Sequence, residues 1–505
     1  GTTQPCNPVT GNKFFEETDY SGAGPFPLQL QRFYNSTRPE PVPAAANWRH
    51  TYDRSIHAGS VSLVGSETKV ARSDGQVLTF SFLGGRWMSD PDVVERLEEQ
   101  VDASGSRSGW VLTDANDTVE AYDALGRLVS ITNRDGFTQT LSYDEISGRL
   151  ETVRGPFGRT LGFAYDQDGR LATMTDPADN VYRYQHDAAG NLSAVIYPDE
   201  TSDDSDNPLR TYVYEDPRFP FHVTGIIDEN GNRFSNVAYD DQGRAILSEQ
   251  EGGINRITIS YNTDGTSTVT DALGNQTVYE VESVYSVFKT TGLSEPCPLC
   301  QNKNAANSYD DKGFPASTTD FNGNLTTFDY DDRGLETSRT EAAGTPESRT
   351  IATEWHPTLR RPVKVTEPGR ETSFSYDSVG RLLTRTVTDT TTGASRTTTR
   401  TYTPDGLPNS PEGLLASIDG PRTDAADITR FEYDEAGNLT KTTNALNHET
   451  LVTDHDPHGR PLTIVDPNDA VTELRYDVRG RLTSRALIIR ESDGNLSRFE
   501  TRFEY

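Results

Sequence analysis

Short stretches of alternating apolar and polar residues recur along most of the chain at a nearly constant interval. An aromatic residue followed by Asp opens most units, and in the clearest part these aromatic residues are Tyr122, Tyr143, Tyr165 and His186, at intervals of 21 or 22 residues. Self-similarity at a fixed period of this size is the mark of a repeat architecture. The chain from Tyr122 onward is therefore predicted to repeat one small structural unit.

Each unit has the pattern of a β-hairpin. Tyr165–Gly169 predicts a turn, because Asp can bond to the backbone that follows it and Gly adopts a positive φ. Arg170–Thr175 alternates and is rich in β-forming residues, Asp176–Asn180 predicts a second turn, and Val181–Tyr184 is the return strand. An isolated hairpin is marginally stable in water, so we expect successive hairpins to form one long antiparallel sheet with a shared buried face.

The repeats occupy 122–505, and insertions lengthen some of them. The array stops at Tyr505, where the pattern requires an Asp to follow, so we expect it to continue beyond the chain end. About sixteen repeats start at Tyr122, Tyr143, Tyr165, His186, Tyr214, Tyr239, Tyr261, Val281, Tyr309, Tyr330, Trp355, Tyr376, Tyr402, Tyr433, His455 and Tyr476.

Two segments precede the array. Residues 1–60 form a separate N-terminal module, in which the alternation of Leu28, Leu30, Arg32 and Tyr34 with their neighbours predicts a strand. Residues 61–121 read as a β-meander, with one helix predicted at Pro91–Gln100 because Pro opens it and acids fill its first turn. The strands predicted around this meander are Ser60–Val64, Lys69–Arg72, Leu78–Phe82, Trp110–Asp114 and Thr118–Tyr122.

The composition agrees with an all-β fold in which one face of the sheet is exposed to solvent. Only 33% of the 505 residues are hydrophobic, yet 22 Tyr and 20 Phe recur at regular positions, which argues against disorder. The net charge of −30 argues against nucleic acid or an anionic membrane as a partner, since both need a basic surface. No apolar run approaches the roughly 18–20 residues of a membrane-spanning helix.

The sequence carries no motif of a common enzyme. It lacks G-x-S-x-G, H-E-x-x-H and a phosphate-binding loop, and two of its eight His residues, His186 and His455, occupy the aromatic position of the repeat. Acidic turns such as Asp166–Gly169 lack the ligand set of an EF-hand, which leaves only weak surface Ca²⁺ binding as an alternative. We expect no catalytic residues, no resident metal and no cofactor.

Three cysteines are present, at positions 6, 297 and 300. Cys297 and Cys300 lie in an insertion over 294–306, and a disulfide that closes this loop is favoured over free thiols or half of a zinc site, because no further ligands lie nearby. Cys6 is expected to be free or bonded outside this chain.

The residues that define the repeat allow two interpretations. Aromatic-Asp pairs could form a carbohydrate-binding surface and Gly-Arg pairs a basic stripe, but aromatic packing, turn formation and a ladder of cross-strand ion pairs are favoured. The residues to which we assign this structural role are Tyr122, Asp123, Gly126, Arg127, Tyr143, Asp144, Gly148, Arg149, Tyr165, Asp166, Gly169, Arg170, Tyr376, Asp377, Gly380, Arg381, Tyr476, Asp477, Gly480 and Arg481.

These motifs resemble a known family. Y-D-x-x-G-R-L, with T-D-P/A-x-G-N after it, is similar to the YD repeats of Rhs proteins, which are related to repeats of teneurins and of the C components of bacterial toxin complexes. The opening N-P-V-T-G-N-K-F-x-E-E-T-D-Y and the later G-A-G-P-F-P-L-Q-L-Q-R-F-Y-N-S resemble the N-terminal module of bacterial Rhs and wall-associated polymorphic toxins.

The resemblance implies a spiralling β-sheet that closes into a hollow shell. It further implies a non-enzymatic role in a secreted or cell-surface bacterial protein, whose shell encloses or presents a C-terminal toxin or cargo domain of the same polypeptide. The family's self-cleaving D-P-x-G core is not assigned to any residue here, because Asp456-Pro457-His458-Gly459 is an ordinary repeat turn. The alternative is an extracellular adhesin or fibre that binds glycans or proteins on neighbouring cells.

Overall fold

The computed structural model describes residues 6–37, 47–59, 63–201, 205–285, 287–296, 304–404, 406, 410–491 and 495–505. Almost all of its regular structure is β-strand, so the predicted all-β class is confirmed. No helix within these residues has the length and apolar character needed to cross a membrane.

The first strands of the chain form two small antiparallel sheets, which we call the N-terminal sheets. The first has the order β1-β2-β3 and the second the order β4-β5-β6-β7. The predicted strand at Leu28–Tyr34 is confirmed as β2, and its alternate residues Leu28, Leu30, Arg32 and Tyr34 are all buried. The strands of the N-terminal sheets are β1 (Phe14–Ser21), β2 (Gln29–Asn35), β3 (Trp48–His50), β4 (Ser55–Ala58), β5 (Glu67–Ala71), β6 (Val77–Leu83) and β7 (Arg86–Met88).

All later strands belong to one sheet of 35 strands, in which each strand pairs antiparallel with the next along the chain. A single turn of 3₁₀ helix, η1 (Glu251–Gly253), interrupts it. The first strands are β8 (Arg96–Val101), β9 (Arg107–Thr113), β10 (Val119–Asp123), β11 (Leu128–Thr132), β12 (Thr138–Tyr143), β13 (Leu150–Arg154), β14 (Thr160–Tyr165), β15 (Leu171–Thr175), β16 (Val181–His186), β17 (Leu192–Ile196), β18 (Leu209–Val213), β19 (Gly225–Ile227), β20 (Arg233–Tyr239), β21 (Ala245–Gln250), β22 (Ile254–Tyr261), β23 (Ser267–Thr270), β24 (Gln276–Val284) and β25 (Val287–Leu293).

The same hairpin pattern continues to the last residues. The remaining strands are β26 (Asn304–Tyr309), β27 (Pro315–Asp320), β28 (Leu325–Tyr330), β29 (Glu336–Glu341), β30 (Arg349–Trp355), β31 (Pro362–Glu367), β32 (Arg370–Tyr376), β33 (Leu382–Asp389), β34 (Ser395–Tyr402), β35 (Leu415–Asp419), β36 (Ile428–Tyr433), β37 (Leu439–Thr443), β38 (Glu449–His455), β39 (Pro461–Val465), β40 (Val471–Tyr476), β41 (Leu482–Arg490) and β42 (Leu496–Arg502).

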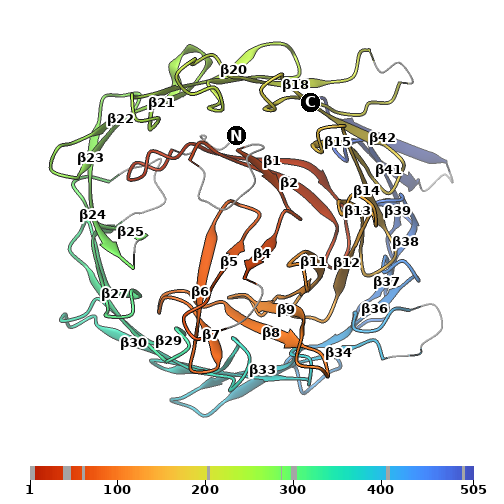
Figure 1. Cartoon of the computed structure of the whole chain (residues 1–505). Helices are drawn as coiled ribbons and strands as arrows, with labels where there is room; N and C mark the ends of the chain where they lie inside the picture. Colours follow the sequence, from red (N-terminus) through yellow and green to blue (C-terminus); the bar gives the residue numbers. More distant parts are fainter. Residues whose placement is uncertain are drawn as a thin grey trace.

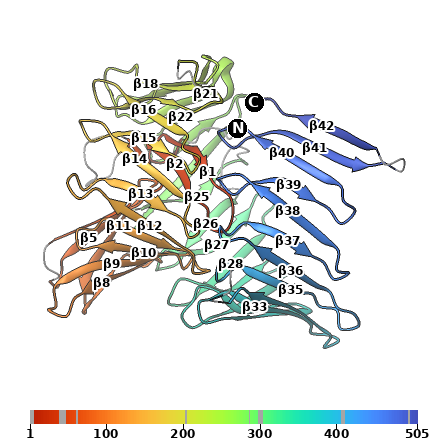
Figure 2. The same ribbon diagram turned by 90° about the vertical axis from the view of Figure 1, so that its right-hand side faces the viewer.

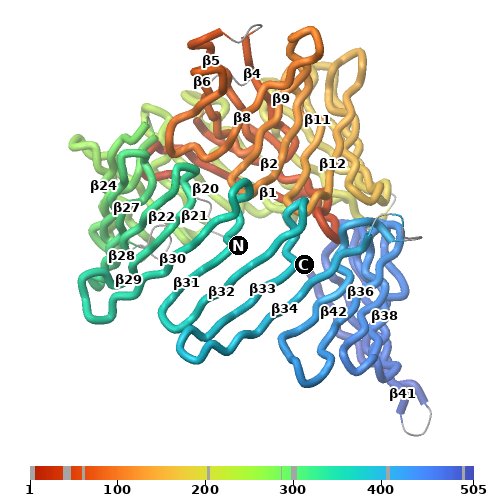
Figure 3. Tube along the Cα trace, turned by 90° about the horizontal axis from the view of Figure 1, so that it is seen from below, coloured from red at the N-terminus to blue at the C-terminus, as the bar shows by residue number. Residues whose placement is uncertain are grey.

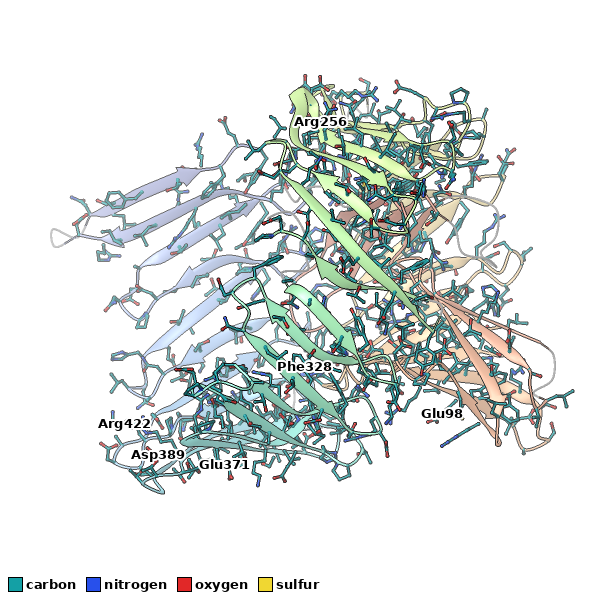
Figure 4. All side chains as sticks on the ribbon, turned by 90° about the vertical axis from the view of Figure 1, so that its left-hand side faces the viewer. Glu98, Arg256, Phe328, Glu371, Asp389 and Arg422 are labelled. Atoms are coloured by element: carbon teal, nitrogen blue, oxygen red, sulfur yellow. The ribbon has the colours of Figure 1, made fainter. Side chains whose placement is uncertain are left out.

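The large sheet curls round the first N-terminal sheet, so that β1 and β2 lie inside the ring of strands (Figure 1). Asp389 and Arg422 lie at an edge of the large sheet, which we call the rim, far from these two strands (Figure 4). Seen from below, β30 to β34 form the part of the wall that faces the viewer (Figure 3).

A β-bulge recurs at the aromatic residue of the repeat and accounts for the curling. Ala121 pairs with Ser130 but Tyr122 pairs with Leu128, so one residue of β11 is left out of register. Bulges bend a strand and increase its twist, so repeated bulges on one edge accumulate into curvature. The same shift occurs at Tyr143, Tyr165, His186, Tyr239, Tyr309, Tyr330, Trp355, Tyr376, Tyr402, Tyr433, His455 and Tyr476.

Turns of the late repeats pack against turns of the early repeats, along a line that we call the seam. The two groups of strands lie next to one another in Figure 2. The side-chain contacts between them advance in parallel along both segments. Because particular late turns meet particular early turns, these side-chain contacts hold the two parts of the sheet in a fixed register. The contacts include Asp117 with Arg360, Asp135 with Arg361, Arg159 with Asn438 and Glu229 with Arg479.

The helix predicted at Pro91–Gln100 is wrong. Arg96–Val101 is strand β8, where Leu97 pairs with Leu112 and both side chains are buried. The first-turn acids and the Pro imitate a helix start, but the β9 edge offers a full set of backbone partners, and this tertiary pairing outweighs the local propensity.

The strand predicted at Ser60–Val64 is not found in the described residues of this range. Ser60, Val61 and Ser62 lie outside the described residues, while Leu63 and Val64 are exposed and outside any strand. The other strands predicted in this segment are confirmed, with shifts of one to three residues at their ends.

The packing at the seam predicts that substitution of one glycine, Gly437, will lower the stability of the fold markedly. Gly437 has φ +72°, and a Cβ built there would lie 2.7 Å from the Phe157 ring. Gly437→Ala therefore combines left-handed strain of about 1–2 kcal/mol with about 1–3 kcal/mol of overpacking. Gly274→Ala is the control, since Gly274 has φ +86° and nothing lies within 4 Å of its added Cβ. Calorimetry should show a larger fall in melting temperature for Gly437→Ala, and equal falls would contradict the seam contact.

Candidate functional site

The Asp, Gly and Arg of a typical repeat build one turn. Asp123 Oδ1 accepts hydrogen bonds from the backbone N–H groups of Leu125 and Arg127, each at 2.9 Å, and Arg127 Nε donates to Oδ2 at 2.7 Å. Gly126 supplies the positive φ of +79° that closes the turn. The same Asp-to-Arg geometry occurs in Asp166–Arg170, Asp377–Arg381 and Asp477–Arg481, with Gly169, Gly380 and Gly480 at positive φ.

The Arg of one repeat lies over the aromatic ring of the next. The Arg127 guanidinium is 4.8 Å from the Tyr143 ring centroid, and the Tyr143 hydroxyl donates to the Leu128 carbonyl at 2.7 Å. Cation–π contacts of this kind contribute about 0.5–2 kcal/mol, depending on burial. The same ring position is found for Arg361 over Tyr376, Arg381 over Tyr402, Arg460 over Tyr476 and Arg481 over Tyr505.

These ion pairs lie within turns, so the predicted cross-strand ladder of Asp–Arg pairs is wrong. Asp123 and Arg127, like the other pairs above, are four residues apart in one loop. The reason is local geometry: the carboxylate that orders the turn is already within reach of the guanidinium that follows the Gly. The Arg links repeats through the next ring instead of through a carboxylate on the next strand.

The second repeat departs from this geometry. Its turn is one residue longer, and Asp144 accepts bonds from the Ser147 backbone N–H and hydroxyl, both at 2.6 Å, in place of an arginine. Gly148 retains a positive φ of +69°. Arg149 lies 5.7 Å from the Tyr165 ring centroid and beside Gly169, so the contact with the next repeat is kept.

A buried ion pair joins the first N-terminal sheet to the inner face of the large sheet. Arg32 on β2 donates to Asp19 on β1 through Nε at 2.6 Å and Nη2 at 2.9 Å, and both side chains are almost fully buried. Tyr184 on β16 and Tyr197 after β17 donate to the Asp19 carboxylate at 2.9 and 3.3 Å. Arg32 Nη2 also donates to the Tyr212 hydroxyl on β18 at 2.9 Å.

The surroundings of Arg32 favour its charged form. Burial by itself opposes charge on Arg32, but Asp19 outweighs it and raises the pKa of the guanidinium well above its ordinary value. The guanidinium also lies 5.0 Å from the ring centroid of Trp48. Burial and the Asp19 charge raise the pKa of Tyr184, so its hydroxyl remains a donor. The Arg32 guanidinium therefore stays charged and the Tyr184 hydroxyl protonated, which makes the cluster a fixed electrostatic link.

A second buried cluster fixes the second N-terminal sheet to the first repeat. Glu120 on β10 has a fully buried side chain and accepts from Arg54 and Arg72, with Arg72 Nη2 at 2.8 Å. The Tyr122 hydroxyl donates to the same carboxylate. Burial opposes ionisation of Glu120, but the two guanidinium groups outweigh it and lower its pKa to about 2.

Sequence reasoning did not single out Asp19, Arg32 or Glu120. A signal was present for Arg32, because it occupies the buried register of Leu28, Leu30 and Tyr34. A charged residue at such a position needs a buried partner of opposite charge. Neither the partner nor the tyrosines could be found from the sequence, because they come from other strands.

Of the cysteines, only Cys6 is described. It is a buried free thiol whose pKa is raised by burial. Cys297 and Cys300 lie outside the described residues, so the predicted disulfide stays a prediction. Within the described part of the chain, no three His, Cys, Asp or Glu side chains gather in a way that could hold a metal ion.

Comparison with known proteins identifies the repeats. The family model "RHS Repeat" matches residues 122–160, 147–180, 165–202, 309–346, 409–448 and 455–486. This chain is an Rhs-repeat protein. A second model, "Domain of unknown function (DUF6531)", matches residues 3–80 of this Rhs-repeat chain and so covers most of the N-terminal sheets.

The curated relatives of this Rhs-repeat protein include two bacterial toxins and a nuclease. Double-stranded DNA deaminase toxin A of Burkholderia cenocepacia is 26% identical over 207 residues, covering 35% of this chain and 14% of the toxin. Toxin protein Tse5 of Pseudomonas aeruginosa is 27% identical over 184 residues, and the tRNA3(Ser)-specific nuclease WapA of Bacillus spizizenii is 28% identical over 153 residues. The chain spans 13% of Tse5 and 6% of WapA, so only a small part of each relative is compared.

Solved structures with a similar chain course include complexes of TcdB2 with TccC3. The complex that also contains Cdc42 has a TM-score of 0.48 at 14% identity and covers 95% of this chain and 27% of that chain. The Tc holotoxin pore of Photorhabdus luminescens has a TM-score of 0.45 at 14% identity and covers 96% of this chain and 30% of that chain.

Breaking the Asp19–Arg32 pair should be more damaging than removing it. Arg32→Met leaves a buried carboxylate without its cation, which costs about 3–5 kcal/mol. Asp19→Leu combined with Arg32→Met removes both charges and should cost clearly less than the sum of the two single changes. Thermal unfolding of the three variants gives the comparison, and additive losses would show that the pair is not coupled.

Glu120 should make the free energy of unfolding fall at acidic pH. Because its pKa falls from 4.5 to about 2 on folding, its contribution is fully present above pH 4.5 and disappears as the pH falls toward 2. The loss amounts to about 3 kcal/mol. Glu120→Gln should flatten the melting-temperature profile between pH 4.5 and 2, whereas Glu145→Gln, at an exposed position, should leave the profile of the natural protein unchanged.

Proposed function

We propose that this chain forms the shell of a secreted or cell-surface bacterial toxin and confines a C-terminal toxin or cargo domain of the same polypeptide. The observation that carries the proposal is a single continuous sheet that curls round the first N-terminal sheet and meets itself along a seam. The toxin relatives support the class of protein. A wall of this kind would separate a harmful or unfolded segment from the cell that makes it.

The inner face of the late repeats supports the proposal that the shell encloses a further segment of the polypeptide. The aromatic residues of the repeats face the same side as the N-terminal sheets, and strand alternation places Phe328 on this side next to Tyr330. Phe328, Phe374 and Phe431 are only half-buried, whereas Phe163, at the equivalent place under the N-terminal sheets, is 8% exposed. The N-terminal sheets therefore cover the early repeats more completely than the late ones.

We propose no enzymatic activity for this chain. The deaminase and nuclease activities in the names of its relatives belong to proteins of which it spans 14% or less. The repeat residues that carry charge or hydroxyl groups are engaged in turns and in contacts between repeats, as for Asp123, Arg127 and Tyr143. In this proposal the N-terminal module is 1–60, the connecting meander 61–121 and the array 122–505, and the repeat residues have structural roles only.

The adhesin alternative is less favoured. A sugar-binding surface needs accessible aromatic faces, but the repeat rings lie beneath guanidinium groups, at 3.9 Å for Arg244 over Tyr261. The exposed face of the sheet instead carries paired hydroxyls, such as Thr386 with Thr397 at 2.9 Å. These satisfy one another across strands and offer no aromatic platform.

The proposal is tested on the full-length gene product. We expect any segment that follows Tyr505 to co-elute with the shell in native gel filtration and to resist added protease while the shell is folded. Arg32→Met, which weakens the contact between β2 and the large sheet, should expose that segment to protease, whereas Arg422→Met at the exposed rim should not. The proposal fails if the following segment is digested equally fast in the folded and the unfolded protein, or if the array elutes as an extended rod.

A further inference from the structure

Three distant parts of the chain meet at one buried histidine. His458 lies in the turn between β38 and β39 of the late repeats, Tyr20 in strand β1, and Asp176 in the turn between β15 and β16 of the early repeats. All three residues are at most 4% exposed. This point is the place on the seam where the first N-terminal sheet also takes part.

The contacts of His458 are specific on both sides of its ring. Nδ1 lies 3.2 Å from the Tyr20 hydroxyl oxygen, and Nε2 lies 3.8 Å from Asp176 Oδ2. The His458 carbonyl accepts a hydrogen bond from the Ala23 backbone N–H at 3.1 Å, which ties the loop after β1 to the same turn. A displacement of this turn would therefore separate the late repeats from both the first N-terminal sheet and the early repeats.

Asp176 is already committed to its own turn. Its Oδ1 accepts from the backbone N–H groups of Ala178 and Asn180 at 2.8 and 3.0 Å, and Oδ2 accepts from Asn180 Nδ2 at 3.0 Å. At 3.8 Å from the ring nitrogen, the carboxylate is beyond the length of a normal hydrogen bond to His458. The carboxylate is thus a distant and partly satisfied partner for a proton on the ring.

We propose that Tyr20, His458 and Asp176 form an acid-sensitive latch, which holds the late repeats against the first N-terminal sheet and the early repeats at neutral pH and loosens when His458 takes up a proton. A neutral Nδ1 can accept the Tyr20 hydroxyl proton, while a protonated ring is a donor at both nitrogens. Protonation therefore reverses the Tyr20 contact and places a charge in a buried site.

The charged groups around the His458 ring shift its pKa in opposite directions. Burial lowers the pKa of His458 below its ordinary value of 6.5, and Arg460 and Arg159 act in the same direction, while Asp176 and Asp456 oppose them. The ring released from the seam binds a proton more readily than the held ring. Release is therefore favoured as the pH falls below about 6.5, and the seam is most stable above it.

Neighbouring contacts of Arg159 at this part of the seam end on uncharged acceptors. Arg159 donates to the Pro457 carbonyl at 2.9 Å and to Asn438 Oδ1 at 2.7 Å, and both acceptors are uncharged. A cleft of about 610 Å³ is lined by Arg159, Asp456 and Pro457 and brings solvent close to the histidine. His458 is the imidazole buried between the three segments, whereas His455 lines the adjacent cleft.

The test is hydrogen–deuterium exchange of the whole chain at pH 7.5 and 5.5, with labelling times scaled to the intrinsic amide rates. We expect peptides that cover Tyr20, Asp176 and His458 to lose up to about tenfold in protection at pH 5.5, the limit set by a released ring of pKa 6.5. Peptides from β32 and β33 should be unchanged. Equal protection of the latch peptides at both pH values would overturn the proposal.

Two variants separate the latch from general acid sensitivity. His458→Asn keeps an uncharged acceptor near Tyr20 and should abolish the pH dependence at the latch, whereas His448→Asn, in an exposed turn, should retain it. A pH dependence that persists in folded His458→Asn would refute the latch. If that variant does not fold, C2-proton exchange of His458 in the natural chain decides, because a midpoint at or above pH 6.5 contradicts the proposal and a lower one supports it.

Discussion

The contact between the arginine of one repeat and the aromatic ring of the next is the interaction on which the rest of the structure depends. A hairpin of five- or six-residue strands cannot bury a face alone, so it is stable only when the next hairpin covers it. Asp123 orders the turn and holds Arg127, Arg127 lies over Tyr143, and Tyr143 bonds back to the Leu128 carbonyl. Each repeat thus positions its successor, and the bulge at the aromatic residue adds curvature at every step.

Curvature creates a second constraint. The inner face of the curled sheet must be buried by another part of the chain. The N-terminal sheets meet this constraint over the early repeats. Two buried charge clusters, around Arg32 and around Glu120, are satisfied only by residues from both the N-terminal sheets and the array. The N-terminal sheets are therefore bound to one position, because a shifted register would separate Glu120 from Arg54 and Arg72 and the Asp19–Arg32 pair from its tyrosine partners.

The seam connects these local rules to the proposed function. A wall that confines a polypeptide must be stable where its two parts meet. Arginine contacts to uncharged backbone carbonyls and amides, such as those of Arg159, supply the constant part of this closure. The buried His458, at the meeting point with β1, adds a part that depends on protons.

The sequence by itself determined the repeat unit, its turns, its strands and the all-β class, because all of these follow from contacts within about five residues or between adjacent strands. Turn geometry joins Asp166 to Arg170 without any help from the rest of the chain. Where a distant edge competes with local propensity, as at Arg96–Val101, sequence reasoning predicted a helix and the structure has a strand. Only the tertiary structure decided which residues meet across the ring: Asp19 with Tyr184, Arg159 with Asn438, and Tyr20 with His458. Their positions depend on the curvature summed over many bulges, and a sequence pattern that specifies each bulge does not specify that sum.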